Sequence, residues 1–404
     1  MSVKRFRYIV FLKDIALLSL TSFGGPHAHI AHFEKQLVAK RKYLSESELS
    51  ELNALCQVLP GPTSTQTLSA IGYKLGGAQL AYLTLLVWAL PSIVLMTAAG
   101  LLIGHYQSKE LSLAFTRFIQ PMAVGFVAYA AYTISIRTIN SKSGVGLMIL
   151  AAVSAFYFRT PFIFPIILLI AGVATSFKYK SQPKEEKEKF EIRWSNFLLW
   201  AGVLILAAVL GGLTKSLPIR LFENFYRNGS LVFGGGQVLT PMLYTEFVEY
   251  AKPMVGSSAK PYVEPEAFLS GFGIAQSLPG PIFSFASYLG VLAMNSRGFG
   301  VAGEITGAFF SAAGIFLPGT FLIFFMIRIW DHLKRYRPIR ASLEGITAAN
   351  AGLVACAAVL LFLPLEFSVT NISFTIGTFC LLVFTRIPSW LLIPVGLLLG
   401  FVIK

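Results

Sequence analysis

The chain has 404 residues, of which 55% are hydrophobic and only 13% are charged. A soluble domain carries roughly a quarter charged residues, so this chain cannot hide its apolar side chains in one water-soluble core, and a lipid bilayer is its expected surrounding. The formal net charge of +14 lies mostly between apolar segments, where positive-inside topology explains it better than nucleic-acid binding does. Composition therefore excludes a water-soluble globular domain, and we expect no nucleic acid as a partner.

The beginning of the chain and its three cysteines predict neither processing nor a metal cluster. Lys13 and Asp14 interrupt the first apolar run and no small-residue cleavage site follows, which favours a retained first helix over a cleaved signal peptide. No cysteine belongs to a Cys-x-x-Cys pair and all three lie in apolar surroundings, so buried thiols are expected rather than disulfides. We expect no metal and no cofactor.

Apolar stretches of spanning length follow one another along the chain. Five are long enough to cross roughly 30 Å of hydrocarbon as helices, and they lie at about 79–104, 117–139, 196–214, 300–329 and 341–363. Two closely spaced pairs are shorter and predict helical hairpins that cross or nearly cross the membrane: 143–158 with 161–177, and 366–384 with 387–403. The pattern predicts an all-α polytopic membrane protein.

One polar linker divides the chain into two halves. Residues 178–193 read KYKSQPKEEKEKFEIR, which predicts a solvated loop or a short surface helix. We expect a first repeat at 1–177, a cytoplasmic linker at 178–194, a connecting transmembrane helix at 195–216 and a second repeat at 217–404.

The two halves carry the same motifs in the same order. Each has a Phe-Gly-Gly, then a Gln-x-x-Pro-Gly-Pro, then a Leu-Pro followed by a small residue, and last an apolar segment with one glycine. The matched segments are 23–26 with 233–236, 57–62 with 276–281, 90–92 with 317–319, and 124–127 with 351–354. An ordered set of this kind favours two diverged copies of one unit over unrelated loop turns.

Charge around the apolar segments predicts that the two copies are inverted. Basic residues near the start of the chain and six in 178–193 place Met1 and the linker in the cytoplasm. The segment 196–214 adds one crossing, so the second half starts outside and Lys404 also lies outside. Equivalent loops differ in charge, as inversion requires; the compared pairs are 34–42 with 246–266, and 105–116 with 331–340.

The Gly/Pro motifs predict breaks in the helices. Proline removes a backbone donor and glycine permits unusual dihedral angles, so two such motifs in each half imply discontinuous or re-entrant segments. Broken backbone survives at membrane depth only where protein or a wet cavity satisfies it. Helix starts at such breaks present free N–H groups and partial positive charge to an anion. Two repeats supply two opposed sets of these ends, which suits a compact tetrahedral oxyanion.

Residues in and beside the breaks are therefore the expected substrate ligands. The backbone candidates are Gly24, Gly25, Pro60, Gly61, Pro62, Gly234, Gly235, Pro279, Gly280 and Pro281. The side-chain candidates are the amides of Gln57, Gln237 and Gln276 and the hydroxyls of Thr63, Ser64, Thr65 and Ser284. Helix capping or packing is an equal alternative for the hydroxyls.

Few titratable groups lie near the apolar segments. His27, His29 and His32 follow the first break, where a metal site, a proton relay or anion contact, and interfacial packing are alternative interpretations. Glu304 and Glu344 lie near helix starts, so an intramembrane function and simple stabilisation by the helix dipole are equal alternatives. Proton-linked exchange through His29, Glu304 or Glu344 is a hypothesis.

At these motifs the chain resembles the chromate ion transporter family in its long, two-repeat form. The resemblance rests on Phe-Gly-Gly-Pro with the following His29, on the segment 43–48, and on the two Gln-x-x-Pro-Gly-Pro motifs, and it covers nearly the whole chain. It implies a secondary transporter in the prokaryotic plasma membrane that exports chromate and confers chromate resistance. The sequence contains no Walker-type ATPase motif. The second half departs from the first by an insertion of about nine residues near 252–260.

Several alternatives remain open at this point. Sulfate or another oxyanion is an alternative substrate. An anion channel and a membrane-embedded metal-dependent enzyme are alternative functions. The coupling ion is open, and so is the choice between a monomer and a homodimer.

Overall fold

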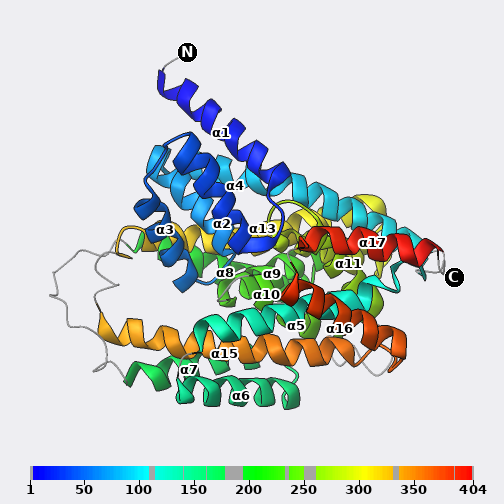
Figure 1. Ribbon diagram of the computed structural model, residues 1–404. Helices are drawn as coiled ribbons and strands as arrows, with labels where there is room; N and C mark the ends of the chain where they lie inside the picture. The colour runs from blue at the N-terminus through cyan, green and yellow to red at the C-terminus, as the bar shows by residue number, and fades with distance from the viewer. Residues whose placement is uncertain are drawn as a thin grey trace. The chain divides into compact units, whose positions relative to one another are not determined.

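The computed structural model describes residues 3–108, 114–139, 141–160, 162–177, 194–232, 236–249, 261–330, 336–385 and 387–402. The regular elements in these ranges are helices, and no strand occurs there, as predicted (Figure 1). The linker 178–193, the loop 250–260 and the glycines Gly234 and Gly235 lie outside the described residues.

The helices repeat in the same order in the two halves of the chain. The first series is α1 (Val3–Thr21), α2 (Gly25–Phe33), the π-helical η1 (Glu34–Lys40), α3 (Glu46–Val58), α4 (Thr63–Ser108), η2 (Ala114–Thr116), α5 (Ile119–Thr138), α6 (Lys142–Tyr157) and α7 (Ile163–Ser176). After α8 (Ser195–Thr214) the second series is α9 (Leu217–Leu231), α10 (Gly236–Tyr244), the π-helical η4 (Thr245–Glu249), α11 (Pro265–Ser277), η6 (Ile282–Ser284), α12 (Phe285–Asn295), α13 (Gly300–Met326), α15 (Arg337–Phe362), α16 (Val369–Phe384) and α17 (Ser389–Val402).

Local details recur along with the order. A π-helical segment follows α2 and another follows α10. The serine before α6, Ser141, accepts a hydrogen bond from the Gly144 amide, and the serine before α16, Ser368, accepts one from the Asn371 amide. These serines satisfy a first-turn donor in the same way at equivalent places. The repeat therefore extends to the caps of its helices.

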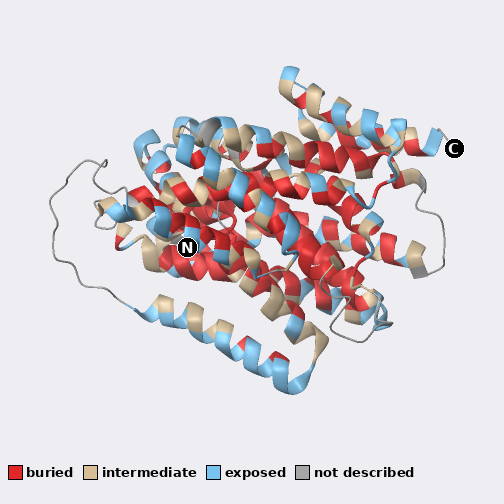
Figure 2. Cartoon of the chain, turned by 90° about the horizontal axis from the view of Figure 1, so that it is seen from below, coloured by how far each residue is buried: buried red, intermediate tan, exposed pale blue. Residues whose placement is uncertain are grey.

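Among the described helices, five are long and apolar enough to cross a membrane, and their spans are Thr63–Gln107, Ile119–Ile136, Ser195–Thr214, Gly300–Met326 and Ala341–Phe362. Large apolar side chains stay exposed on many helices, for example Leu169 on α7 and Leu213 on α8. Figure 2 shows exposed and buried residues on different sides of the same helices. Exposed apolar faces of this kind fit a lipid environment.

One interruption of a helix was not predicted. The helix α4 continues through Pro91, within the predicted spanning stretch 79–104, and is interrupted at Gly77, where φ is 73°. Likewise α13 continues through Pro318. A spanning helix tolerates an internal proline when neighbouring groups satisfy the freed carbonyl, whereas a left-handed glycine changes the direction of the chain.

The chain forms two compact units, and each takes segments from both repeats. The first unit contains Met1–Gly104, Arg193–Gly236 and Ala275–Arg328, and the second contains His105–Ile192, Gln237–Ile274 and Ile329–Lys404. The second unit has an apolar core from α5, α16 and α17, with Ile119, Met122 and Ile393 buried in it. The bounds of the repeats, 1–177 and 217–404, stay a prediction.

Glycines at equivalent positions make reciprocal contacts in the second unit. A Cβ at Gly125 on α5 would lie 2.7 Å from the Thr375 carbonyl of α16, and one at Gly352 on α15 would lie 2.0 Å from the Met148 carbonyl of α6. The two contacts are equivalent, because Gly352 lies 227 positions after Gly125 and Thr375 lies 227 positions after Met148. Each repeat thus packs its glycine helix on the short helix of the other repeat.

Candidate functional site

The two Pro-Gly-Pro breaks are joined to the opposite repeat by matching backbone hydrogen bonds. The Gly61 amide donates to the Val232 carbonyl at 2.7 Å, and the Gly280 amide donates to the Ser22 carbonyl at 2.9 Å. Val232 and Ser22 are the residues directly before the two Phe-Gly-Gly motifs. Both glycines have positive φ, 122° for Gly61 and 93° for Gly280. The amide of each break is therefore bonded by the residue that directly precedes the Phe-Gly-Gly motif of the other repeat.

The same two breaks pack against the proline-containing helices of the opposite repeat. A Cβ at Gly61 would lie 3.3 Å from the Gly319 Cα on α13, and a Cβ at Gly280 would lie 3.2 Å from the Ser92 side chain on α4. These contacts are again reciprocal, because Ser92 and Gly319 hold equivalent places in the Leu-Pro motifs. Each Leu-Pro motif thus lines the break of the opposite repeat.

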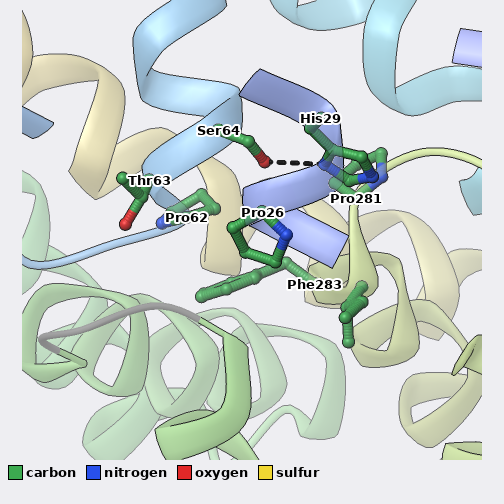
Figure 3. Close-up of a pocket in the computed structure, with 8 residues that line it drawn as sticks. Pro26, His29, Pro62, Thr63, Ser64, Pro281 and Phe283 are labelled. Atoms are coloured by element: carbon green, nitrogen blue, oxygen red, sulfur yellow. Dashed lines mark hydrogen bonds between the residues drawn. The ribbon is translucent and has the colours of Figure 1, made fainter. Parts of the chain in front are cut away.

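A pocket lies where three helices of the first unit begin (Figure 3). Its lining residues are Pro26, His29, Pro62, Thr63, Ser64, Pro281, Ile282 and Phe283. Pro26 lies in the first turn of α2, Thr63 begins α4, and Ile282 begins η6, which leads into α12. Amides of a first helical turn have no partner within the helix, and the helix dipole places partial positive charge there. Three helix starts therefore border this pocket.

His29 is the titratable residue of this lining, and it is buried with an exposed fraction of 1%. Its Nδ1 lies 3.0 Å from the Ser64 hydroxyl (Figure 3). Its ring packs edge-on against Trp88. Its Nε2 makes no hydrogen bond with any described residue. The backbone of Ser22 also lies near the ring. If Ser64 donates to Nδ1, the proton of the neutral ring lies on Nε2, which makes no hydrogen bond of its own with a described residue.

The polar side chains of the pocket come from one repeat. Thr63 and Ser64 stand where the second repeat has Ile282 and Phe283. The two breaks are alike in backbone geometry, but one wall offers hydroxyl groups and the other offers apolar side chains. Backbone amides and a few hydroxyls can hold an anion whose remaining faces meet apolar surface.

The pocket is narrow. Its interior has room for about one water molecule, which is less than a tetrahedral oxyanion needs. An anion that binds between these helix starts therefore requires one of the walls to move.

The structure distributes the predicted site residues over several places. Pro62, Thr63, Pro281 and His29 line the pocket, whereas Gln57 is exposed and Gln276 is buried outside the lining. The remaining described backbone candidates lie in the breaks themselves: Gly24, Gly25, Pro60, Gly61, Pro279 and Gly280. Gln237 lies in α10, and its side chain is outside the described part. The ligand role of each of these residues stays a prediction.

The two predicted acids lie apart from the lining. Glu304 is buried on α13 and accepts a hydrogen bond of 2.7 Å from the Asn295 side chain. Glu344 belongs to the second unit, where it accepts a hydrogen bond of 2.5 Å from Ser141. Both carboxylates thus have neutral hydrogen-bond donors as neighbours.

Sequence reasoning missed Gln66. This side chain is 1% exposed and bonds two backbone carbonyls, those of Pro60 and Gly319. The available signal was the run Thr-Ser-Thr-Gln-Thr directly after the Pro-Gly-Pro, because polar residues on every face of an apolar helix predict a polar surrounding. In the structure all residues of 61–70 are buried.

The features together define a polytopic α-helical membrane protein made of two copies of one unit. The chain belongs to the chromate transporter family, whose model matches residues 10–176 and 219–401. Two matched regions are consistent with a two-repeat layout. Family membership makes the protein a membrane transporter and supports a role in chromate transport.

Curated relatives cover the chain at low identity. It is 23% identical over 402 residues to an uncharacterized transporter of Methanocaldococcus jannaschii, which covers 98% of this chain and 93% of the relative. It is 24% identical over 355 residues to a chromate transport protein of Cupriavidus metallidurans, with 85% and 80% covered. An uncharacterized transporter of Bacillus subtilis matches 39% of this chain over 88% of its own length, at 23% identity. No solved structure matches the chain.

Proposed function

We propose that the protein is a secondary transporter that exports chromate, or a similar tetrahedral oxyanion such as sulfate, across the prokaryotic plasma membrane. The observation that carries this proposal is the convergence of three helix starts on one buried pocket with the Nε2 of His29 unpaired among the described residues. Such a site offers hydrogen-bond donors and partial positive charge without a fixed cation, which lets an anion bind and leave again.

The same geometry supports a carrier over an open channel. The pocket is closed to less than the size of the anion, so passage requires a wall to move for each ion transported. Two breaks of matching backbone geometry, one in each repeat, give two such walls. In inverted-repeat carriers, repeats that rock around a fixed midplane site open it to alternate sides.

Export of a dianion needs no coupled ion. An inside-negative potential assists each outward negative charge by roughly 2.3 kcal/mol per 100 mV, so two charges gain about 4.6 kcal/mol, or some three decades of concentration ratio. Uniport therefore suffices for chromate resistance, and proton exchange would only add to the drive.

We expect inside-out membrane vesicles that contain the protein to accumulate labelled chromate faster than vesicles from cells that carry an empty vector. An interior-positive potential should increase the rate, because it favours entry of the dianion. Unlabelled sulfate should compete if the site takes tetrahedral dianions in general. Equal accumulation in both vesicle types, for chromate and for sulfate, would contradict the proposed function.

A further inference from the structure

Gln66 is a buried side chain that bonds both repeats at once. It stands in the first turns of α4, four residues after Pro62. Its Nε2 donates to the Pro60 carbonyl at 2.8 Å, within its own repeat, and to the Gly319 carbonyl at 3.2 Å, in the other repeat. A single amide thus holds the first break against α13.

The glycines on both sides leave room for this amide. A Cβ added at Gly61 would lie 2.8 Å from Gln66 Nε2, and so would a Cβ added at Gly319. At Gly319 the three nearest atoms to the added Cβ all belong to the Gln66 side chain. The packing here is built around the glutamine.

The second break cannot make this contact through the equivalent residue. Phe285 stands where the first repeat has Gln66, and its ring cannot donate a hydrogen bond. The nearest neighbours of Gly280 are the Ser92 side chain and the Ser19 carbonyl, and the Ser92 hydroxyl donates to Ala89 in its own helix. The Ser284 hydroxyl donates to the Pro281 carbonyl at 2.8 Å, within the same repeat. Two breaks that match in backbone geometry therefore differ at the position of Gln66, where only the first has a side chain that donates to the opposite repeat.

We propose that Gln66 is a positioning residue whose hydrogen bonds hold the start of α4 against α13, an arrangement called the latch below. The wall of the pocket with Thr63 and Ser64 then stays in place while the opposite wall moves first. This inference rests on the proposed transport through the pocket. Thr63 and Ser64 lie between Pro62 and Gln66, so a fixed Gln66 also fixes both hydroxyls. The wall that moves first is then the unlatched one, Pro281–Phe283.

Hydrogen–deuterium exchange of the full-length protein in nanodiscs tests the latch without reference to transport. Gln66→Met keeps the length of the side chain and removes the amide, so peptides that cover 59–70 should exchange about tenfold faster. Peptides that cover 278–290 should not change. Ser69→Ala is the matched control, because Ser69 is equally buried on the same helix and its hydroxyl bonds no described residue.

A second variant reaches the same amide from the other repeat. Gly319→Ala should push Gln66 aside and give the same local increase in exchange over 59–70. In a Gln66→Ala protein, the three side-chain atoms nearest to the added methyl group are gone. Gly319→Ala should then change the exchange over 59–70 by less than twofold. Unchanged exchange over 59–70 in both Gln66→Met and Gly319→Ala would overturn the latch.

Transport kinetics separate positioning from simple stability. With the latch removed, the two hydroxyls are less well held, so we expect the KM for chromate to rise about fivefold while the maximal rate stays within about twofold. An equal loss of maximal rate and protein abundance, with KM unchanged, would show a structural role only and contradict the proposal. If the wild-type protein transports no oxyanion but the variants change hydrogen exchange as expected, the proposed function is contradicted, whereas the role of Gln66 in holding α4 against α13 is supported.

Discussion

Replacing Gly61 or Gly280 by leucine should lower chromate transport more than a hundredfold. Both residues have φ values in the region that side chains rarely adopt, 122° and 93°, where strain amounts to about 1–3 kcal/mol. A side chain at Gly61 would also meet Gln66 and the Gly319 backbone, and one at Gly280 would meet Ser92. Each substitution therefore disturbs the backbone bond that joins the break to the opposite repeat, and with it the helix starts at the pocket.

The experiment needs a control substitution of glycine by leucine outside the breaks, which shows the effect of a leucine on membrane insertion and protein abundance alone. Gly202→Leu on α8 serves this purpose, because Gly202 is exposed and an added Cβ there meets no atom within 4 Å. We expect its transport rate to stay within about twofold of the wild type in the vesicle assay, with transport normalised to protein in the membrane. Near-normal transport by well-expressed Gly61→Leu and Gly280→Leu would remove the breaks from the transport site.

His29→Phe should raise the KM for chromate by about 10- to 150-fold. A phenyl ring keeps the packing against Trp88 and Phe33 but removes the Nε2 donor and the bond to Ser64. A hydrogen bond to a charged group contributes about 1.5–3 kcal/mol, which corresponds to this range. His29→Gln should recover most of the affinity, because its amide can donate in place of Nε2.

The same pair of variants tests the hypothesis that His29 carries a proton. In vesicles whose potential is held at zero with potassium and valinomycin, a pH gradient alone should drive chromate accumulation if transport is proton-coupled. A proton carrier at His29 predicts that His29→Gln loses this accumulation, whereas a hydrogen-bond donor predicts that it keeps it. Glu344→Gln is the companion variant. A His29→Phe protein with wild-type KM would contradict a contact between this residue and the anion.

The fold was predictable where the sequence pattern is local. Apolar runs of spanning length predicted the long helices, and the paired Pro-Gly-Pro motifs predicted breaks that Gly61 and Gly280 confirm with positive φ. The interleaving of the repeats was not predictable, because it depends on bonds between residues far apart, such as Gly61 with Val232. The interruption of α4 at Gly77 was not predicted either, because Gly77 lies in none of the repeated motifs.

The site was predictable in its backbone and not in its side chains. Pro62 and Pro281 belong to the motif that predicted the site, and both line the pocket. Gln57 belongs to the same motif, yet it is exposed, because it lies on the outer face of α3. Gln66 lies outside the motif and is buried at the break. A repeated motif contains only residues that the two repeats share. Gln66, Thr63 and Ser64 are replaced by apolar residues in the second repeat, so the comparison of the repeats could not identify them.

The order of synthesis gives the exchanged contacts a further consequence. Gln66 leaves the ribosome long before its partner Gly319, from which it is separated by 253 positions. Until then the first half must stay in the membrane with the Pro60–Gly61 break uncompleted, because the carbonyl of Val232 is also still missing. Contacts of such long range form late and slowly. The nascent first half is therefore the stage at which this protein most needs protection from misassembly.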